Sequence, residues 1–374
     1  MSHEKHNSSL QLFKQIYPQI VEFLEEKKTP PFRIKQIQHA IFKEYITQFS
    51  QITTLPKYLR EELDSTFSLQ SFTLLEAHST DEVTKLLFKT FDGEFVESVI
   101  IFHHDGRKTL CVSSQIFCAV GCKFCATGAT TFKRSLNVQE MVEQLLFAQK
   151  YVSSNFDDTV SNIVFMGMGE PLLNFKVVKV ALEAYNHPDF FGIGARHITL
   201  STSGVLPKLK EFIQMPQQFK LAISLHAANN ELRTEIMPIN KRYPLDELMA
   251  VCDEYVALKN KRVSYEYVII NGVNDTLDHA QELVDLLSTR KAHLNLLMYN
   301  EHEFSDYTRP KYDTVMNFYE YVKRGGVEVS LRKSMGKDSE SACGQLSGHA
   351  QKEKDKKNSK EMQVENSTQA IISY

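Results

Sequence analysis

The chain has 374 residues, of which 42% are hydrophobic and 24% charged, an ordinary composition for one large domain and a small accessory one. Its formal net charge of −3 argues against a protein that coats nucleic acid by bulk electrostatics, but leaves room for a local basic groove. No run approaches the roughly 20 apolar residues that a membrane span needs, and the polar first residues lack the core of a secretory signal. We therefore expect a cytoplasmic protein without a membrane partner.

Residues 1–80 are predicted to form a small helical accessory domain. The segment 33–43 places its apolar residues on one helical stripe, and a second helix is expected after Leu55-Pro56. The stripe consists of Ile34, Ile37, Ile41 and Phe42. These apolar residues predict that the domain packs on the main body.

From about residue 84 the pattern changes to strands. Thr84–Thr90 and Phe95–Phe102, joined by the turn at Asp92-Gly93, predict a β-hairpin. Six β-branched runs then alternate with amphipathic ones, which is typical of parallel strands with helical crossovers. The six runs are Thr109–Ser114, Asn162–Met166, His197–Ser201, Lys220–Leu225, Val263–Ile270 and His293–Tyr299, and the clearest helical patterns are Val138–Lys150, Pro244–Leu258 and Leu277–Leu287.

Six units are too few for a closed eight-stranded barrel, so the expected fold is α/β, an open, partial, six-stranded parallel β/α barrel. A last strand is expected at Val327–Lys333. The main domain should span residues 81–348, and the polar residues 349–374 should form a disordered tail.

Polar or unusual residues follow the predicted strands directly. Cys118 to Cys125 come after the first strand, Gly-Met-Gly-Glu-Pro (167–171) after the second, and Ser-Thr-Ser-Gly (201–204) after the third. Ser224 to His226 close the fourth, and Tyr299-Asn300 closes the sixth. Since active sites of parallel α/β barrels are built at this strand end, the pattern predicts one site there.

Three of the six cysteines lie in one short segment, Cys118-x-x-x-Cys122-x-x-Cys125. Cytoplasmic thiols stay reduced, so these residues are better interpreted as ligands than as disulfides. Thiolates hold iron–sulfur clusters, and three ligands would leave one iron of a four-iron cube open for a small molecule. Structural zinc usually needs four protein ligands, and no second cysteine pair is present. The spacing favours an open cluster, with a zinc-dependent, non-catalytic RNA-binding protein as the alternative.

Several motifs together resemble those of the RlmN/Cfr adenosine methyltransferases within the radical S-adenosylmethionine superfamily, over about residues 33–346. The motifs are Cys111-Val-Ser-Ser-Gln, Cys118…Cys122-Lys-Phe-Cys125-Ala-Thr-Gly, Met166-Gly-Met-Gly-Glu-Pro-Leu, Leu225-His226, Met237-Pro-Ile-Asn and Ala342-Cys-Gly-Gln-Leu346. The resemblance implies a [4Fe–4S] cluster on Cys118, Cys122 and Cys125. It also implies methylation of an adenosine in 23S rRNA, with tRNA as a further substrate.

The resemblance also implies roles for two further cysteines and one carboxylate. Cys343 would accept a methyl group, and an adenosyl radical from a second S-adenosylmethionine would remove hydrogen from it. The methylene radical would add to the base and leave a covalent protein–RNA adduct. Cys111 would release the product by forming a disulfide with Cys343, while Glu97 takes the ring proton. Taken alone, Cys111 and Cys343 would be buried small residues and Glu97 a solvent-facing carboxylate.

Cofactor contacts are implied at residues after the strands. Gly169 and Glu170 would meet the amino group of S-adenosylmethionine. Contacts to its carboxylate, ribose and adenine would come from Ser201, Ser224, Leu225, His226 and Asn300. Taken alone, His226 would be a buried, hydrogen-bonded histidine. An electron donor such as flavodoxin is implied as a partner, and we expect a monomer.

The chain departs from the family pattern beside the cluster motif. Phe117 stands where the family usually has glycine, and would be strained if that position needs a positive φ. Thr130-Thr131 replaces a glycine-containing stretch before the basic pair Lys133-Arg134, a candidate RNA contact. Two other basic clusters, more often solvated than functional, are Lys241 with Arg242, and Lys259 with Lys261 and Arg262.

The methylated carbon is open between carbon 2 and carbon 8 of adenosine. Pro171 after Glu170 resembles RlmN, whereas the segments 33–37 and 83–88 resemble Cfr. We expect carbon 2 because it is the commoner activity.

Overall fold

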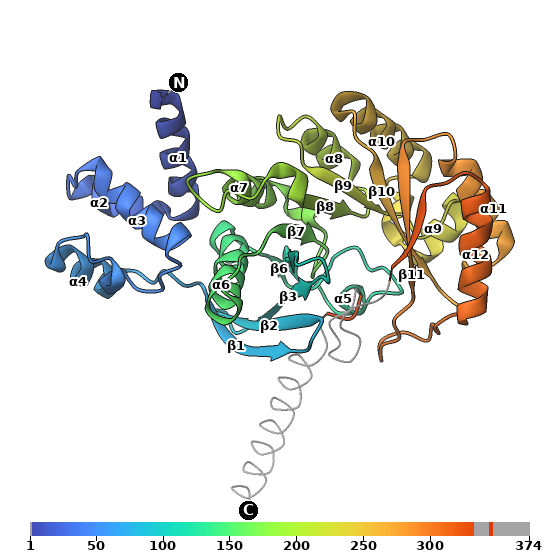
Figure 1. Ribbon diagram of the computed structural model, residues 1–374, viewed down its shortest axis with the longest axis horizontal. Coiled ribbons are helices and arrows are strands. Elements are labelled where there is room, and N and C mark those ends of the chain that lie inside the picture. Colours follow the sequence, from blue (N-terminus) through green and yellow to red (C-terminus); the bar gives the residue numbers. More distant parts are fainter. Residues whose placement is uncertain (1, 333–343, 347–374) are drawn as a thin grey trace, which may run out of the picture.

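The computed structural model describes residues 2–332 and 344–346 as a group of N-terminal helices beside a larger α/β body (Figure 1). The residues predicted as a tail, 349–374, and Cys343 lie outside the described residues. The bulk of the sheet and its crossover helices form the larger body, and the two parts share packed side chains.

The N-terminal helices form their own apolar core. Its elements are α1 (Ser2–Ile16), α2 (Pro18–Glu26), α3 (Pro31–Lys43), η1 (Phe49–Gln51) and α4 (Lys57–Thr66). Helices α2 and α3 begin with prolines. The first N–H groups of a helix have no partner within the helix, so the missing proline N–H costs no hydrogen bond there. The predicted stripe of α3 is buried, and the core extends onto Val142, Ala184 and Phe190 of the larger body. The helical accessory region therefore packs on the main body through apolar contacts.

The larger body is built on one ten-stranded sheet with the order β1-β2-β3-β4-β7-β8-β9-β10-β11-β12. Strands β4 to β12 in this order are all parallel to their neighbours, whereas β1 to β4 are antiparallel. The strands are β1 (Phe72–Ser79), β2 (Val83–Thr90), β3 (Phe95–Phe102), β4 (Lys108–Cys111), β7 (Asn162–Phe165), β8 (Ile198–Thr202), β9 (Lys220–Ser224), β10 (Val263–Ile269), β11 (Ala292–Met298) and β12 (Val329–Arg332).

The predicted open parallel α/β fold is confirmed. All six predicted strands are present, and β12 adds a seventh parallel strand to them. Because β1 and β12 end the described sheet on opposite sides, the sheet does not close into a barrel. The predicted hairpin is also present as β2 and β3, with Gly93 at φ +80° in its turn.

The prediction that helices continue to about residue 80 is wrong for its last part, because residues 72–79 form strand β1. This segment pairs with β2 along the outer edge of the sheet, and most of its side chains are exposed. An exposed edge strand buries too few apolar residues to produce a clear alternation in the sequence, which is why the pattern missed it.

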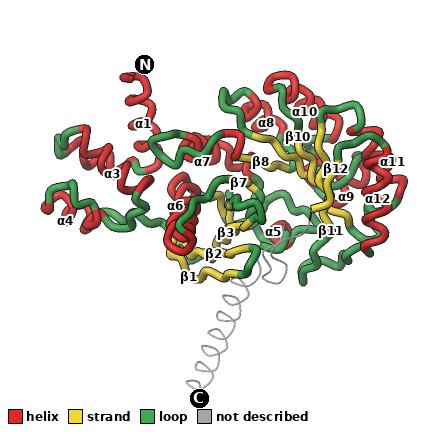
Figure 2. The backbone as a smooth tube through the Cα atoms, viewed as in Figure 1, coloured by secondary structure: helices red, strands yellow, loops and turns green. Residues whose placement is uncertain are grey.

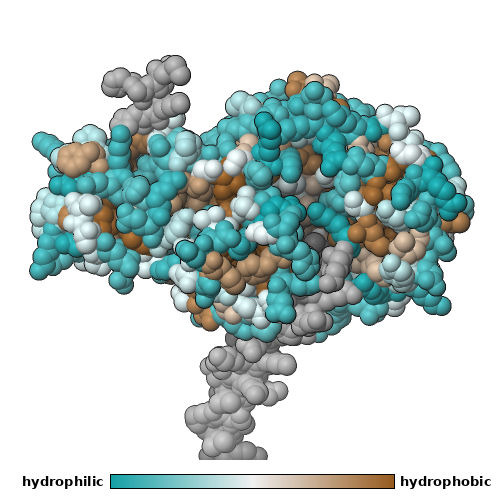
Figure 3. Space-filling view, in the orientation of Figure 1, coloured by the Kyte–Doolittle hydropathy of each residue, from teal (hydrophilic) through white to brown (hydrophobic). Residues whose placement is uncertain are grey.

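Helices and short turns connect the parallel strands and lie around the sheet (Figure 2). The connecting elements are α5 (Ala126–Ala129), α6 (Val138–Phe156), η2 (Pro171–Asn174), α7 (Phe175–Asn186), η3 (Ala195–His197), α8 (Leu206–Ile213), α9 (Asn230–Ile236), η4 (Pro238–Lys241), α10 (Leu245–Lys259), α11 (Leu277–Leu287) and α12 (Tyr312–Arg324). Their apolar faces and the sheet form one continuous core. On the face seen in Figure 3, hydrophilic residues dominate and hydrophobic ones show only in separate patches.

A second, two-stranded sheet closes the cysteine segment. Strand β5 (Gln115–Ile116) pairs antiparallel with β6 (Arg134–Ser135), and the backbone N–H of Lys133 adds a bond to the Ile116 carbonyl. The residues between them, 117–133, form a loop that we call the cluster loop. Its two ends are thus held together on the main body.

Candidate active site

One cavity lies at the carboxyl ends of the parallel strands, where the sequence predicted a site. It is lined by residues from the cluster loop and from the segments that follow β7, β8, β9 and β11. Among them are Cys118, Cys122, Cys125, Gly169, Glu170, Ser201, Ser224, His226 and Asn300. Nine residues predicted as cluster ligands or cofactor contacts are thus brought to one place by seven parallel strands.

The cluster loop folds tightly around its three cysteines. The N–H of Cys125 donates to the Cys122 carbonyl at 3.2 Å, and Gly121 has φ +71°. A Cβ on Gly128 would lie 3.0 Å from both the N and the O of Cys122, so only glycine lets the loop close this far. Gly121 and Gly128 therefore belong to the geometry of the thiol segment.

The three thiols suit an iron–sulfur cluster that keeps one iron open. Burial raises the pKa of Cys118 to about 12 and that of Cys122 well above its ordinary value, so bare thiolates are disfavoured until a cationic centre binds them. No three His, Cys, Asp or Glu side chains in the described ranges are grouped to hold a single metal ion. A cube instead spreads its thiolates over separate irons, as three cysteines on one cavity wall allow.

His226 shares the cavity but is not arranged as a fourth ligand. Its Nδ1 accepts the N–H of Val268 at 3.0 Å, so in the neutral ring Nε2 carries the proton. Burial and the nearby Arg233 charge lower its pKa to about 3, which keeps the ring neutral. The ring packs against Phe124 of the cluster loop, with centroids 4.6 Å apart. His226 is thus a neutral N–H donor against the cluster loop, and its own backbone has φ +59°.

Phe117 has φ +60°, the left-handed backbone that would strain a residue with a Cβ at this position. Its side chain is 2% exposed and belongs to the main apolar core. The left-handed conformation costs a residue with a Cβ about 1 to 2 kcal/mol, whereas deleting a buried phenylalanine side chain costs about 3 to 5 kcal/mol. Packing therefore outweighs strain, which explains how phenylalanine stands here in place of glycine.

We expect Phe117→Gly to destabilise the protein by roughly 2 to 3 kcal/mol, because it loses the packing and regains only the strain. Phe117→Ala keeps the strained backbone and should be less stable than Phe117→Gly by about 1 kcal/mol. Urea denaturation of the three proteins in parallel measures both differences. Equal stability of the glycine and alanine variants would show that the backbone at residue 117 is not strained.

The glycines after β7 let two strand ends approach each other. A Cβ on Gly167 would lie 2.7 Å from the Ser113 Oγ, and one on Gly169 would lie 2.5 Å from the Gln115 Cβ. Gly169 also has φ +96°. Gln115 uses the space beside Gly169 to accept the N–H of Glu170 at 2.9 Å. The Gly-Met-Gly-Glu segment is thus fitted against β5 at the base of the cluster loop.

Glu170 is a buried carboxylate whose lone-pair positions are all used. One oxygen accepts the Leu172 N–H at 3.0 Å and the Thr202 hydroxyl at 2.7 Å, and the other accepts the N–H and hydroxyl of Ser203 at 2.7 and 2.8 Å. Burial raises its pKa, while these hydrogen bonds oppose the rise. The carboxylate therefore ties the end of β7 to the end of β8, and it can act on a ligand ammonium through its charge.

The remaining predicted cofactor residues occupy different depths. Ser201 and Ser224 line the cavity, whereas Leu225 is fully buried and donates its N–H to the Glu266 carbonyl at 2.9 Å. Asn300 also lines the cavity, and its Oδ1 accepts from Arg309 at 3.3 Å. Leu225 thus contributes backbone position rather than a side chain.

Two charged residues that help to build the cavity were not predicted from the sequence. Arg233 is fully buried and donates to the carbonyls of Ser203, Ser224 and Leu225, which joins the ends of β8 and β9. Asn240 accepts a further bond from it at 2.7 Å. The only signal was the Met237-Pro-Ile-Asn240 motif, whose asparagine turns out to be the partner of Arg233.

Glu266 on β10 is the second missed residue. It is 7% exposed, lines the cavity, and accepts from Asn295 at 2.8 Å. Burial raises its pKa. In the sequence it was one acidic residue within an apolar strand, and nothing marked it as facing the cavity.

Glu97 and Cys111 lie on neighbouring strands rather than on the cavity wall. Val99 pairs with Cys111 across β3 and β4, so Glu97, two residues before Val99, points to the same face as Cys111. Cys111 is 7% exposed. Glu97 is buried, which corrects the solvent-facing interpretation, and lies 3.5 Å from the Lys85 ammonium. Burial of a carboxylate requires such a charged partner.

The described cysteines form no disulfide with one another, and the disulfide expected between Cys111 and Cys343 during the reaction involves Cys343, which lies outside the described residues. Its neighbour Gly344 is described, however. Gly344 lines the cavity, and its carbonyl accepts the N–H of Ala126 in the cluster loop at 2.8 Å. The Thr127 hydroxyl donates to the Leu346 carbonyl at 2.6 Å. The segment after Cys343 is therefore attached to the cluster loop.

Comparison with known proteins matches this arrangement. Residues 112–287 match the Radical SAM superfamily, and residues 10–69 match the Ribosomal RNA large subunit methyltransferase N-terminal domain. The probable dual-specificity RNA methyltransferase RlmN of Geobacillus kaustophilus is 40% identical over 336 residues, which cover 90% of this chain and 92% of that protein. The chain belongs to the RlmN/Cfr family of radical S-adenosylmethionine RNA methyltransferases.

Two further relatives fit the RlmN/Cfr assignment. The ribosomal RNA large subunit methyltransferase Cfr of Staphylococcus warneri is 39% identical and covers 90% of this chain and 97% of its own. The crystal structure of a radical SAM methyltransferase from Sphaerobacter thermophilus has a TM-score of 0.85 at 38% identity, covering 89% of this chain and 98% of that one. The RlmN and Cfr relatives are thus about equally similar to this chain.

Membership of the RlmN/Cfr family settles the class of protein. The chain is a methyltransferase, and its cofactors are a [4Fe–4S] cluster and S-adenosylmethionine. The alternative of a zinc-dependent, non-catalytic RNA-binding protein is therefore wrong. Among the described residues, no helix is both long and apolar enough to span a membrane.

Proposed function

We propose that this enzyme methylates carbon 2 of an adenosine in 23S rRNA, with tRNA as a second substrate. Relatives at 40% identity are named dual-specificity RNA methyltransferases, and the N-terminal match carries the name of a large-subunit ribosomal RNA methyltransferase. Pro171 after Glu170 resembles RlmN, and it lines the cavity and begins η2. These observations support RNA as the substrate and favour carbon 2.

One observation carries the proposal: Gly344 lines the same cavity as the cluster cysteines and is hydrogen-bonded to Ala126, the residue after Cys125. Cys343 directly precedes Gly344 in the sequence. The attachment of Gly344 to the cluster loop supports Cys343 as the carrier of the methyl group from which an adenosyl radical removes hydrogen.

The chain's own residues would complete the reaction as follows. The methylene radical carbon on the Cys343 sulfur would bond to the adenine carbon. The unpaired electron that this addition leaves on the base would return to the cluster, and Glu97 would accept the proton that the carbon loses. The Cys111 thiolate then attacks the Cys343 sulfur, so that a disulfide forms as the sulfur–carbon bond breaks and the released methyl group gains a proton. Glu97 and Cys111 on one face of β3 and β4 support this division of roles.

The cavity residues would bind the cofactors. Cys118, Cys122 and Cys125 would hold the cluster, which together with S-adenosylmethionine supplies the adenosyl radical. The backbone of Gly169 and the charge of Glu170 would meet the cofactor's ammonium, and Ser201 and Asn300 its other polar groups. The neutral His226, with Ser224 and Leu225, would border its adenine and ribose.

Methylation of carbon 8 is the second candidate. The Cfr relative is 39% identical over 344 residues, and segments 33–37 and 83–88 resemble Cfr. The β2 strand that carries segment 83–88 also carries Lys85, the partner of Glu97. The two candidate functions differ in which adenine carbon, 2 or 8, is methylated and then loses its proton to Glu97.

Nucleoside mass spectrometry of rRNA and tRNA from cells with and without the gene tests the proposal. We expect 2-methyladenosine in both RNAs only when the gene is present. A gene-dependent 8-methyladenosine would favour the second candidate, and no gene-dependent methyladenosine in either RNA would contradict both. Purified enzyme with transcribed RNA is the control for an indirect effect of the gene.

The remaining expectations stay proposals. We propose a reduced flavodoxin-type protein as electron donor, a monomeric enzyme and a cytoplasmic location. We also propose the N-terminal helices before β1 as an accessory domain, the residues from β1 to 348 as the radical domain and 349–374 as a tail. The boundary expected at residue 80 moves because β1 belongs to the main sheet. Size-exclusion chromatography with light scattering tests the monomer.

A further inference from the structure

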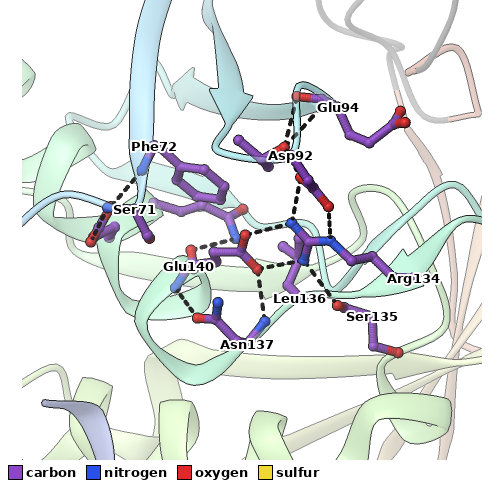
Figure 4. Close-up of polar contacts among 12 residues, drawn as sticks. Ser71, Phe72, Asp92, Glu94, Arg134, Ser135, Leu136, Asn137 and Glu140 are labelled. Carbon is purple, nitrogen blue, oxygen red and sulfur yellow. Dashed lines mark hydrogen bonds and ion pairs between the residues drawn. The ribbon is translucent and has the colours of Figure 1, made fainter. Parts of the chain in front are cut away.

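Arg134, a member of one predicted basic cluster, lies between two carboxylates of the protein itself (Figure 4). Its Nε and Nη2 donate to the two oxygens of Asp92 at 2.6 and 3.0 Å. Its Nη1 and Nη2 donate to the two oxygens of Glu140 at 2.8 and 2.7 Å. The planar guanidinium makes two bidentate pairs at once, which lysine could not do. Arg134 is therefore not an available contact for RNA phosphate.

Glu140 is the fixed end of this arrangement. It occupies the first turn of α6, where Asn137 accepts the Glu140 N–H at 2.9 Å and Glu140 accepts the Asn137 N–H at 2.8 Å. Its side chain is 4% exposed, whereas that of Asp92 is 48% exposed. The capping box holds Glu140 in place, so Arg134 ties the more exposed Asp92 turn to α6.

The Asp92 end reaches the strand of the proposed proton acceptor. Asp92 lies in the turn between β2 and β3, and β3 carries Glu97. Leu87 of β2 pairs with Glu97 across the hairpin, and Lys85 of β2 is its ionic partner. A movement of this turn would therefore be transmitted along both strands that position Glu97.

The backbone of Arg134 reaches the cofactor side. Arg134 and Ser135 form β6, which closes the cluster loop against β5. The Ser135 hydroxyl accepts from Gln115 at 3.2 Å, and Gln115 in turn accepts the N–H of Glu170 at 2.9 Å. Two hydrogen bonds thus connect the Arg134 strand to the proposed S-adenosylmethionine site.

We propose that Arg134 is a positioning residue that keeps the cluster loop in register with the hairpin bearing Glu97, so that radical formation leads to methylation of the base. The inference rests on the proposed function. Without the guanidinium, the Asp92 and Glu140 carboxylates would face each other uncompensated, and their repulsion would push the hairpin turn away from α6.

The test measures coupling: methylated adenosine formed per 5′-deoxyadenosine released, with purified, cluster-loaded enzyme, dithionite and transcribed 23S rRNA fragment. We expect Arg134→Gln to lower this ratio roughly tenfold, because displacement of a reacting group by about 1 Å can cost up to 100-fold in rate. Iron content and 5′-deoxyadenosine formation should stay near wild type. A purely structural role would lower both products together and leave the ratio unchanged.

Matched variants make the result specific. Asp92→Asn weakens only the pair between Arg134 and the β2–β3 hairpin, and it should also lower the ratio. If Arg134→Gln does not accumulate as folded protein, Asp92→Asn alone tests the inference. Arg134→Lys keeps the positive charge but cannot make two bidentate pairs, so its ratio should lie between those of Arg134→Gln and the wild type. The controls are Arg107→Gln and Asp105→Asn, an exposed pair at 2.7 Å in the β3–β4 turn, which should behave as wild type.

Two outcomes would overturn the inference: an unchanged ratio in Arg134→Gln or Asp92→Asn, or an equal fall in the Arg107 and Asp105 controls. Failure of the proposed function looks different, because the wild-type enzyme would then yield 5′-deoxyadenosine but no methylated adenosine.

Discussion

Replacing Cys111 with alanine is expected to leave the enzyme covalently joined to its RNA. Without the Cys111 thiolate nothing attacks the Cys343 sulfur, so the sulfur–carbon bond to the base persists after the first turnover. The buried position of Cys111 on β4 lets alanine replace it with little disturbance of the core. Incubation with labelled RNA, S-adenosylmethionine and reductant, followed by denaturing electrophoresis, should show a band that nuclease shortens.

Cys252→Ala is the matched control for this experiment. Cys252 is a fully buried cysteine on α10, away from the cluster loop in sequence and absent from the cavity wall. It should turn over without trapping RNA. If Cys111→Ala yields only free RNA while Cys252→Ala is active, the adduct mechanism is wrong for this enzyme.

Replacing a single cluster ligand should abolish the reaction at its first step. We expect Cys118→Ala to lose most of its iron and to lower 5′-deoxyadenosine formation by more than about 100-fold, since altering even an outer-shell partner of a metal ligand costs 10- to 100-fold. Iron analysis, the visible absorbance bleached by dithionite, and chromatography of 5′-deoxyadenosine measure the effect. The Cys111→Ala protein should keep its iron, which separates the two cysteine roles.

Full 5′-deoxyadenosine formation by Cys118→Ala would show that Cys118 does not bind the cluster. A loss of iron in the Cys252→Ala control would instead point to general instability on removal of a buried thiol. The three ligands should respond alike, so Cys122→Ala and Cys125→Ala complete the series.

Repetitive patterns made most of the fold predictable. The alternation of β-branched and amphipathic runs located every parallel strand, and the helix predicted at Leu277–Leu287 has those bounds in the structure. The edge strand β1 was missed because exposure on one side of a sheet removes the apolar signal. Hydrophobic periodicity arises from burial of one face of an element, so an element with little burial cannot be predicted from it.

The candidate site was predictable where several rare residues stand close together. The cysteine spacing and the Gly-Met-Gly-Glu-Pro segment are local, and both line the cavity. Arg233 and Glu266 were not predicted, and Arg134 was predicted only as a candidate RNA contact, because each acts through partners that only the folded chain brings near. Such residues look like ordinary charged positions until their tertiary contacts are known.

The contact between the Thr127 hydroxyl and the Leu346 carbonyl joins residues 219 positions apart. This contact cannot form on the ribosome until the chain up to Leu346, and with it every described strand, has been synthesised. The attachment of Gly344 and Leu346 to the cluster loop therefore forms only after the three thiols at 118, 122 and 125 have been synthesised. During synthesis the cluster loop therefore lacks its contacts to Gly344 and Leu346 until these residues have been added to the chain.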